Sequence, residues 1–267
     1  MRLLLRVALA AAWCGAPFVL AQDLEQQMSC DQENWHSDRV SHCEIDETTL
    51  PATGTLAVDG GVNGGKAVKG WQKHEILVRA RVKISGDTDA QARALAGRIT
   101  IRTGGGRVIA DGPSTARHES WSVSYEIFVP QKMDLNLKAH NGGIHIADVR
   151  GNIEFETTNG GVTLHRLAGN VEGHTTNGGL SVELAETRWE EERLDASTTN
   201  GGVSMAVPAA YSAHLETGTV NGHINIDFPV TVRGEISRQL SLDLGSGGPL
   251  VRAITTNGGV SIKRKET

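Results

Sequence analysis

The second half of the chain alternates between apolar and polar residues in a way that is typical of β-strands. The alternation restarts after each of six asparagines, with apolar residues three and five positions later. These pairs are Ile144/Ile146, Val162/Leu164, Leu180/Val182, Val203/Met205, Ile224/Ile226 and Val260/Ile262. A period of two places alternate side chains on one face of a strand. The pattern therefore predicts six strands that each bury one face.

The same asparagines mark a second apolar position, six residues before each of them. It is occupied by Leu135, Ile153, Val171, Leu194, Leu215 and Val251. The asparagines are Asn141, Asn159, Asn177, Asn200, Asn221 and Asn257, and successive ones lie 18, 18, 23, 21 and 36 residues apart. A glycine follows each asparagine, and both residue types tolerate the positive φ of tight turns. The spacing predicts repeats of about 18 residues, each with two strands and two turns.

Two all-β architectures satisfy this pattern. In a solenoid, equivalent strands stack in parallel and like residues form ladders, whereas in a meander each Asn-Gly pair is the tip of a hairpin. The solenoid is favoured because both strands of every repeat keep their apolar positions in the same register. The hairpin meander remains the alternative.

The segments before and after the repeats are predicted to close the ends of the stack. Strand-like runs cover Thr55 to Val58, Glu75 to Ile84, Ile99 to Ile101 and Ser120 to Val129. Between them, Asp87 to Ala96 is predicted to form one short helix, capped by Asp87 or Thr88 and ended by Gly97. The segment from Asp227 to Pro249, with alternating leucines at 240, 242 and 244, is predicted to close the other end.

The beginning of the chain resembles a secretory leader, so we expect an exported protein of the periplasm or cell surface. Two arginines precede an apolar run that ends at Leu20, and a cut after Ala21 is predicted. The predicted organisation is a signal peptide over 1–21, a disulfide-bearing segment over 22–50 and a repeat domain over 51–267. Cys30 and Cys43 remain after the cut and are expected to form a disulfide. A metal site that adds His36 and His42 is the less favoured alternative.

Composition narrows the range of functions. The 267 residues carry a net charge of -5 without a basic run, so nucleic-acid binding has no support. No apolar run after the leader is long enough to span a membrane as a helix. No nucleophile, metalloprotease or phosphate-loop motif occurs, so no catalytic residue and no cofactor is predicted.

One polar row and one group of histidines remain as candidate sites. The position five residues before each asparagine holds Asn136, Glu154, Glu172, Asp195, Glu216 and Arg252. Four consecutive acids, Glu154, Glu172, Asp195 and Glu216, would form a stripe for divalent cations or a basic partner, although a solvated face is the simpler interpretation. His140, His145, His165 and His174 invite a metal hypothesis, but their register favours solvated polar rows.

Several of these features together resemble a known bacterial family. They are Cys30 to Cys43, the strand 54–58, Val62-Asn63-Gly64-Gly65 followed by Gly70-Trp71, and the repeated Thr-Asn-Gly-Gly-Val units. They resemble the bacterial putative-adhesin family of β-strand-repeat proteins of unknown function, from about Cys30 onward. The resemblance implies a right-handed β-helix-like fold and an envelope location, with no catalytic residues to transfer.

Three functions are consistent with the sequence. The first is a non-enzymatic envelope module, adhesin-like or a scaffold, that binds a protein or glycan through flat polar faces. The second is a β-helix-type polysaccharide lyase or hydrolase, which would need acids converging on one face. The third is a regulatory partner in envelope-stress responses. The first is favoured because the acids lie in a row rather than a cleft.

Overall fold

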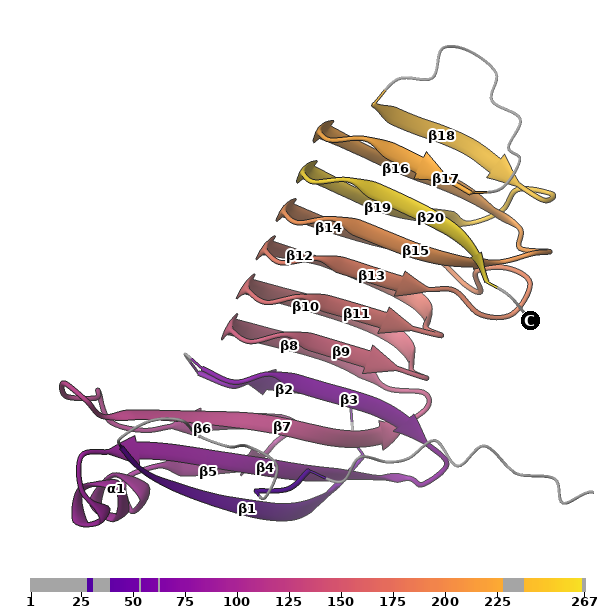
Figure 1. Cartoon of the computed structure of the whole chain (residues 1–267). Helices are drawn as coiled ribbons and strands as arrows, with labels where there is room; N and C mark the ends of the chain where they lie inside the picture. The colour runs from indigo at the N-terminus through magenta and orange to yellow at the C-terminus, as the bar shows by residue number, and fades with distance from the viewer. Residues whose placement is uncertain (1–27, 31–38, 53, 62, 228–237, 266–267) are drawn as a thin grey trace, which may run out of the picture.

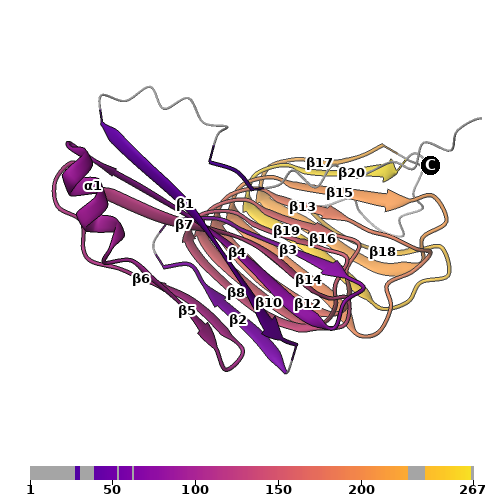
Figure 2. The same cartoon turned by 90° about the horizontal axis from the view of Figure 1, so that it is seen from below.

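The computed structural model describes residues 28–30, 39–52, 54–61, 63–227 and 238–265, and the predicted leader lies outside them. The described chain is all-β with one helix, and its strands form two long sheets that face each other (Figures 1 and 2). In spatial order, the first sheet, sheet A, contains β1 (Val40–Pro51), β4 (Glu75–Gly86), β7 (Ser120–Pro130), β3 (Lys66–Trp71), β9 (Ile144–Ala147), β11 (Val162–His165), β13 (Leu180–Glu183), β15 (Val203–Pro208), β20 (Val260–Lys265) and β17 (Ile224–Ile226). The second, sheet B, contains β18 (Gln239–Leu244), β16 (Ala213–Asn221), β19 (Leu250–Asn257), β14 (Arg193–Asn200), β12 (Ala168–Asn177), β10 (Arg150–Asn159), β8 (Asp134–Asn141), β2 (Thr55–Asp59), β6 (Arg107–Asp111) and β5 (Thr100–Gly104).

The repeats stack in parallel, as the solenoid interpretation predicts. Strand β10 pairs in parallel with β8 and with β12, which places Asn159 opposite both Asn141 and Asn177. In sheet A, β11 pairs in parallel with β9 and β13. Hairpins would make these pairs antiparallel, so the meander is excluded for these repeats. The fold is a β-solenoid-like stack of two sheets, and its right-handed winding stays a prediction.

The repeats do not stack in the order of the sequence. The repeat that comes last, β19 and β20, lies between the repeat of β14 and β15 and the repeat of β16 and β17. Strand β19 is parallel to both β14 and β16, and β20 is parallel to both β15 and β17. Figure 1 shows the yellow β19 and β20 inserted among orange strands. Asn257 consequently lies opposite both Asn200 and Asn221.

Antiparallel strands and the predicted helix form the N-terminal end of the stack. β4 pairs with β1 and β7, and β5 pairs with β6. The helix α1 (Asp89–Ala96) begins after Thr88, whose side chain and that of Gln91 form a reciprocal capping box. At the other end, β18 carries the predicted alternating leucines and pairs antiparallel with β16, so this part of the predicted closing segment covers the edge of sheet B. The part over 228–237 lies outside the described residues.

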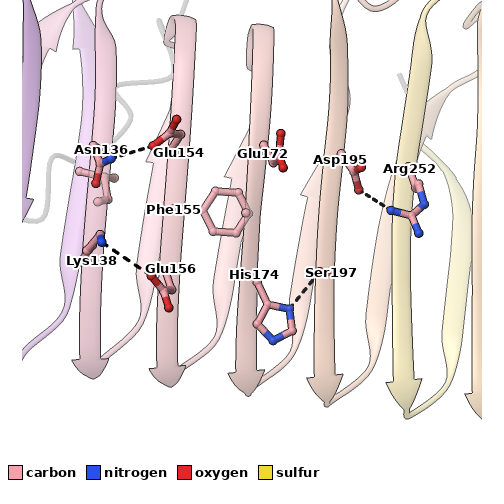
Figure 3. A pocket seen from close by; sticks show the side chains of 12 residues that line it. Asn136, Lys138, Glu154, Phe155, Glu156, Glu172, His174, Asp195, Ser197 and Arg252 are labelled. Carbon is pink, nitrogen blue, oxygen red and sulfur yellow. Dashed lines mark hydrogen bonds and ion pairs between the residues drawn. The ribbon is translucent and has the colours of Figure 1, made fainter.

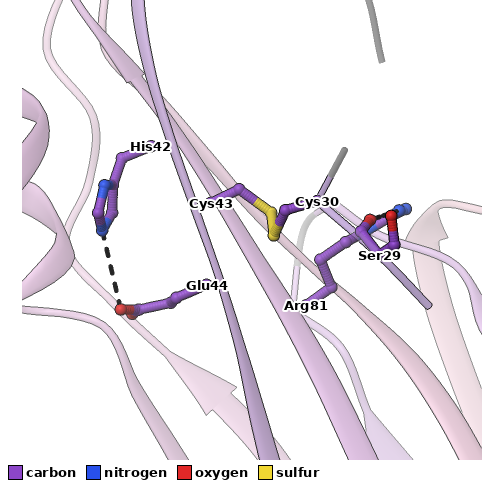
Figure 4. Close-up of a disulfide and its surroundings, with 6 residues drawn as sticks. All are labelled: Ser29, Cys30, His42, Cys43, Glu44 and Arg81. Atoms are coloured by element: carbon purple, nitrogen blue, oxygen red, sulfur yellow. Dashed lines mark hydrogen bonds and ion pairs between the residues drawn. A yellow bond between two sulfur atoms is a disulfide. The ribbon is translucent and has the colours of Figure 1, made fainter. Parts of the chain in front are cut away.

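The predicted disulfide between Cys30 and Cys43 is present (Figure 4). It holds residues 28–30 against β1, and the Arg81 guanidinium on β4 donates a hydrogen bond to the backbone oxygen of Ser29 over 3.1 Å. β1 continues from this segment and pairs with β4 along its whole length. His36, part of the alternative metal set, lies outside the described residues.

The inward rows form one continuous core between the sheets. Its largest fully buried members include Leu135, Ile144, Ile146, Ile153, Leu164 and Leu180. A row of buried threonines adjoins these apolar rows at the turn. Their hydroxyls donate to glycine carbonyls of neighbouring repeats, as in Thr157 to Gly142, Thr175 to Gly160, Thr198 to Gly178, Thr255 to Gly201 and Thr219 to Gly258. The polar row therefore stabilises the turn from inside.

Replacing Thr175 by valine is expected to lower the free energy of unfolding by about 1 kcal/mol. Valine preserves the shape of the side chain but removes the hydroxyl that donates to the Gly160 carbonyl over 2.7 Å. Urea denaturation measures the change. Thr176→Val is the matched control, because Thr176 is the next residue and faces outward on the same strand. Equal losses in both variants would contradict a specific role for the buried hydroxyl.

The asparagines of the turns form a ladder of side-chain amides along the stack. From the second asparagine onward, each Nδ2 donates to the Oδ1 of the preceding one over 2.7 to 3.0 Å, in the spatial order Asn63, Asn141, Asn159, Asn177, Asn200, Asn257 and Asn221. The ladder follows the spatial order of the repeats, so it passes through Asn257 before Asn221. It satisfies amide groups that stack one above another.

The glycine after most of the asparagines serves a purpose that differs from the prediction. Positive φ occurs at Gly64 and Gly258, and at Gly151 and Gly169 in the opposite turns, but not at Gly160 or its equivalents in the neighbouring repeats. A Cβ atom on Gly160 would lie 2.2 Å from the carbonyl oxygen of Gly142. Glycine is therefore required at this position by the close approach of adjacent backbones and not by a left-handed conformation.

Candidate functional site

The predicted acidic row lies on the outer face of sheet B, but its order differs from the sequence. Glu154 and Glu172 are direct neighbours, and Asp195 follows Glu172. Arg252 comes next and separates Asp195 from Glu216, because the last repeat is inserted at this point. The expectation of four neighbouring acids is thus corrected to three acids, a cation and a fourth acid.

Partners from neighbouring strands meet the acids of this row. The amide of Asn136 donates to Glu154 over 2.7 Å, and the Arg193 guanidinium lies 2.9 Å from Glu172. The Arg252 guanidinium lies 2.8 Å from a carboxylate oxygen of Asp195 and 3.7 Å from one of Glu216. Figure 3 shows the contacts of Asn136 and Arg252. This pairing reduces like-charge repulsion along the row. Binding of a divalent cation stays a prediction, which a calcium titration of the wild type and Glu172→Gln would test.

A depression of about 520 Å³ lies over the middle of this face. Outward side chains surround it, and the inward-facing residues between them line it from below. The lining residues are Asn136, Leu137, Lys138, Glu154, Phe155, Glu156, Glu172, Gly173, His174, Asp195, Ser197 and Arg252 (Figure 3). Gly173 stands opposite Phe155, and a Cβ there would lie 2.5 Å from the aromatic ring. The glycine therefore accommodates the buried Phe155 ring within the sheet.

The polar side chains of the depression hold one another in place. His174 is hydrogen-bonded through Nδ1 to the Ser197 hydroxyl at 2.9 Å and through Nε2 to the Thr199 hydroxyl at 3.2 Å. Lys138 lies 3.9 Å from Glu156 on the adjacent strand. The loop over 184–192 does not line the depression; its Trp189 is buried, and the indole donates to the Gly169 carbonyl. The depression is shallow, polar and open.

The four histidines considered for a metal site do not converge. His140 and His174 lie on sheet B, and the His140 ring is hydrogen-bonded to the Thr158 hydroxyl at 3.2 Å. His145 and His165 lie on sheet A, with ring centroids 5.1 Å apart. Among the described residues, no group of three or more His, Cys, Asp or Glu side chains could hold a metal ion.

A second polar cluster joins repeats on the outer face of sheet A. The Arg166 guanidinium makes two hydrogen bonds to Asp148, of 2.6 and 2.8 Å, and these hold the pKa of Asp148 below its usual value. Lys265 binds Glu183 and lowers the pKa of that carboxyl. Burial, followed by the charges of His165 and Arg166, lowers the pKa of His145. The cluster is internally paired, so it stabilises the stack and leaves little free charge for a ligand.

Sequence reasoning missed one unusual pair inside the stack. Lys66 is 3% exposed and Tyr125 is 1% exposed, and neither the Lys66 amine nor the Tyr125 hydroxyl has a hydrogen-bond partner. Burial lowers the pKa of Lys66 to about 8, opposed by the nearby Asp59 carboxylate, and burial raises the pKa of Tyr125. Lys66 lies three residues after Asn63, where the other repeats carry an aliphatic residue. A lysine at a position that is otherwise aliphatic was the sequence signal from which this buried amine could have been predicted.

Residues 83–263 match the profile of the family described as Toastrack DUF4097, which is more than half of the chain. The chain belongs to the Toastrack DUF4097 family. For this Toastrack protein, no curated protein gives a significant match. Among the described residues of this Toastrack protein, no helix is long and apolar enough to cross a membrane.

Several solved structures are similar to this Toastrack protein. One is a putative cell adhesion protein from Clostridium sporogenes ATCC 15579, with 12% identity, coverage of 85% of this chain and 100% of that chain, and a TM-score of 0.41. Another is a putative adhesin from Bacteroides fragilis NCTC 9343, with 12% identity, coverage of 83% and 97%, and a TM-score of 0.27. A putative lipid binding protein from Parabacteroides distasonis ATCC 8503 has 12% identity, coverage of 83% and 97%, and a TM-score of 0.28. Membership of the Toastrack family rests on the profile match and not on these structures.

Proposed function

We propose that this Toastrack protein is an exported, non-enzymatic envelope protein that binds an extended glycan chain on the outer face of sheet B. The observation that carries the proposal is the open polar depression of about 520 Å³ on that face. Its groups come from equivalent positions of consecutive repeats, including Asn136, Glu154 and Glu172. The protein would act in the periplasm or at the cell surface after removal of the predicted signal peptide.

The regular spacing of the strands supports a polymeric ligand. Neighbouring strands of a sheet stand about 4.8 Å apart, which is close to the length of one sugar unit in an extended chain. Successive repeats would therefore offer similar hydrogen-bonding groups to successive sugars along the stack. Carboxylates, an amide, a hydroxyl and an imidazole at these positions can all bond to sugar hydroxyls.

The charge arrangement supports binding rather than catalysis. Glycoside hydrolysis usually requires two carboxyl groups on opposite sides of the scissile bond, one of them as a proton donor. Here Glu154, Glu172 and Asp195 lie side by side in one row, and partners from neighbouring strands contact each of them. A row of paired carboxylates can position a polar chain but is poorly arranged to attack it from two sides.

The substitution Ser197→Tyr tests whether the outer face of sheet B is the glycan-binding surface. Ser197 points outward from β14 into the depression, so a tyrosine there would occupy the space of the ligand. Ser181→Tyr is the matched control, because Ser181 points outward at the corresponding face of sheet A. Calorimetry with neutral and acidic polysaccharides and cell-wall glycan fragments should show at least about tenfold weaker binding for Ser197→Tyr, equivalent to about 1.4 kcal/mol. The control should bind like the wild type.

Three results would contradict the proposal. Equal affinity of Ser197→Tyr and the wild type would remove the sheet B face from consideration. Absence of binding to every polysaccharide would oppose a glycan ligand, and crosslinking in intact envelope would then test for a protein partner of regulatory type. New reducing ends or unsaturated sugars in the incubated samples would indicate a hydrolase or a lyase.

A further inference from the structure

The last repeat of the sequence lies between two earlier repeats of the stack. We use the term insertion slot for the space between the repeat of β14 and β15 and the repeat of β16 and β17. Residues 250–265 fill it and pair in parallel with strands on both sides in both sheets. The edges of β14, β15, β16 and β17 therefore form the insertion slot, and all four pair with this one segment of the sequence.

Specific contacts across both sides fit that segment to the slot. On one side, Thr255 donates to the Gly201 carbonyl and Arg252 pairs with Asp195. On the other, Thr217 donates to the Ala253 carbonyl over 2.7 Å, and Thr219 donates to the Gly258 carbonyl over 2.8 Å. Inward side chains of the segment, such as those of Val251, Ala253 and Ile262, are completely buried. A segment with the same sequence from another copy would reproduce all of these contacts.

The two repeats that flank the slot are aligned with each other. They share the register of the stack, because each lies opposite the same residues of β19: Leu194 and Leu215 both face Val251, and Asn200 and Asn221 both face Asn257. Stacks of interchangeable repeats permit such exchange because each repeat contacts only its neighbours.

The connection into the segment has the features of a hinge. The chain leaves β18 at Leu244, on the outer side of β16, and returns past β16 to begin β19 at Leu250. Three of the five linking residues are glycines with positive φ, namely Gly245 at 55°, Gly247 at 75° and Gly248 at 145°. Glycine adopts both signs of φ readily, so rotation at these positions can direct β19 elsewhere with little steric cost.

We propose that residues 250–265 are exchanged between copies, so that the insertion slot of one copy receives the β19 and β20 repeat of a second copy. Exchange of an identical element is a low-cost route to an oligomer, because the contacts within and between chains are the same. The partner that this surface selects is thus a second copy of the chain, and the exchanged form increases with protein concentration. An envelope protein linked in this way would present more than one sheet B face.

Two variants of the full chain, each with one cysteine added to the disulfide-bonded Cys30 and Cys43, test the exchange. Ser204 on β15 and Ser261 on β20 are Cα partners and point outward, so cysteines there lie at the spacing a disulfide requires. Ser204→Cys and Ser261→Cys, each with Cys14→Ser, are mixed, unfolded in urea without reductant, refolded together at high concentration and oxidised. Exchange places the two new thiols opposite each other in different chains. A disulfide-linked heterodimer on non-reducing gels is the expected result.

A matched pair and a double variant make the result decisive. Thr163→Cys replaces Ser204→Cys in the control, because Thr163 lies in the same outward row but is separated from β20 by two strands. The control should give several times less heterodimer. The double variant Ser204→Cys/Ser261→Cys should close a disulfide within one chain at low concentration, which shows that the fold and the geometry are intact. Closure in the double variant without heterodimer above the control level would overturn the proposal.

Discussion

Replacing Lys66 by methionine is expected to raise the free energy of unfolding at pH 7 by about 3 kcal/mol. The side chain lies inside the stack, where its amine has no hydrogen-bond partner, and burial lowers its pKa from 10.5 to about 8. At pH 7 the folded protein therefore holds a protonated amine at a buried position, and the nearby Asp59 carboxylate offsets only part of the cost of burial. Methionine has a similar length and no charge, so it removes this desolvation cost.

The pH dependence of the difference provides a second measurement. Because the pKa of Lys66 is lower in the folded protein than in the unfolded chain, the unfolded chain binds more protons between about pH 8 and 10.5. The wild type is therefore expected to gain stability through this window relative to Lys66→Met. The advantage of the variant should be largest below pH 8 and should decrease as the pH rises.

Urea denaturation of both proteins from pH 7 to 9.5 measures this difference, and the range stays below the titration of most tyrosines. The matched control is Lys69→Met, because Lys69 lies on the same strand with its side chain on the outer face. Lys69→Met should change neither the stability at pH 7 nor the pH dependence appreciably. Our assignment of Lys66 as a buried cation would fail if Lys66→Met were no more stable than the wild type at pH 7.

Replacing Gly178 by alanine is expected to destabilise the protein by about 3 to 5 kcal/mol, enough to unfold much of the stack. A Cβ atom at this position would lie 2.1 Å from the carbonyl oxygen of Gly160 and 2.4 Å from its carbon. Both atoms belong to the backbone of the neighbouring repeat, so no side-chain rotation relieves the overlap. The strands must move apart, which also disturbs the hydrogen bond between the amides of Asn177 and Asn159.

Gly179→Ala is the matched control for this prediction, because it alters the next residue of the same turn. A Cβ on Gly179 would meet the nearest atom, the Gly202 carbonyl oxygen, at 3.5 Å, which is an ordinary contact. Its loss in stability should stay below about 1 kcal/mol, the usual cost or gain of a glycine-to-alanine change without a clash. Thermal unfolding followed by circular dichroism compares the two. Similar losses would show that backbone freedom, and not close approach, sets the need for glycine at Gly178.

Both predictions concern the way in which adjacent repeats pack against each other. The Asn-Gly turns bring the backbones of adjacent repeats into close contact, which permits the amide ladder and the buried threonine row. Lys66 stands where this regular packing begins, three residues after Asn63, and there a polar group replaces the aliphatic residue of later repeats. The stack thus tolerates one costly buried residue on β3, between β7 and the first of the regular repeats at β9.

Much of the fold could be predicted because its signals are local. Alternation around each asparagine identified the inward rows, and residues such as Ile146 and Val171 are indeed buried. The capping of α1 by Thr88 follows from hydrogen bonds within four residues of sequence. The disulfide of Cys30 and Cys43 followed from the export signal and the even number of cysteines that remain after the cut. Each of these features depends on residue type and spacing alone.

The sequence by itself therefore determined the strands of the repeats, the faces they bury and the turns between them, whereas β1 and β6 were not predicted. Only the tertiary structure decided which repeats are neighbours. All repeats carry the same register, so their pattern is compatible with any stacking order, and the long connection before Leu250 allows the last repeat to enter between two earlier ones. That choice placed Arg252 between Asp195 and Glu216 and changed the predicted acidic stripe into a row of paired charges. Contacts between repeats arise from spatial neighbours, and for this reason they could not be obtained from the order of the chain.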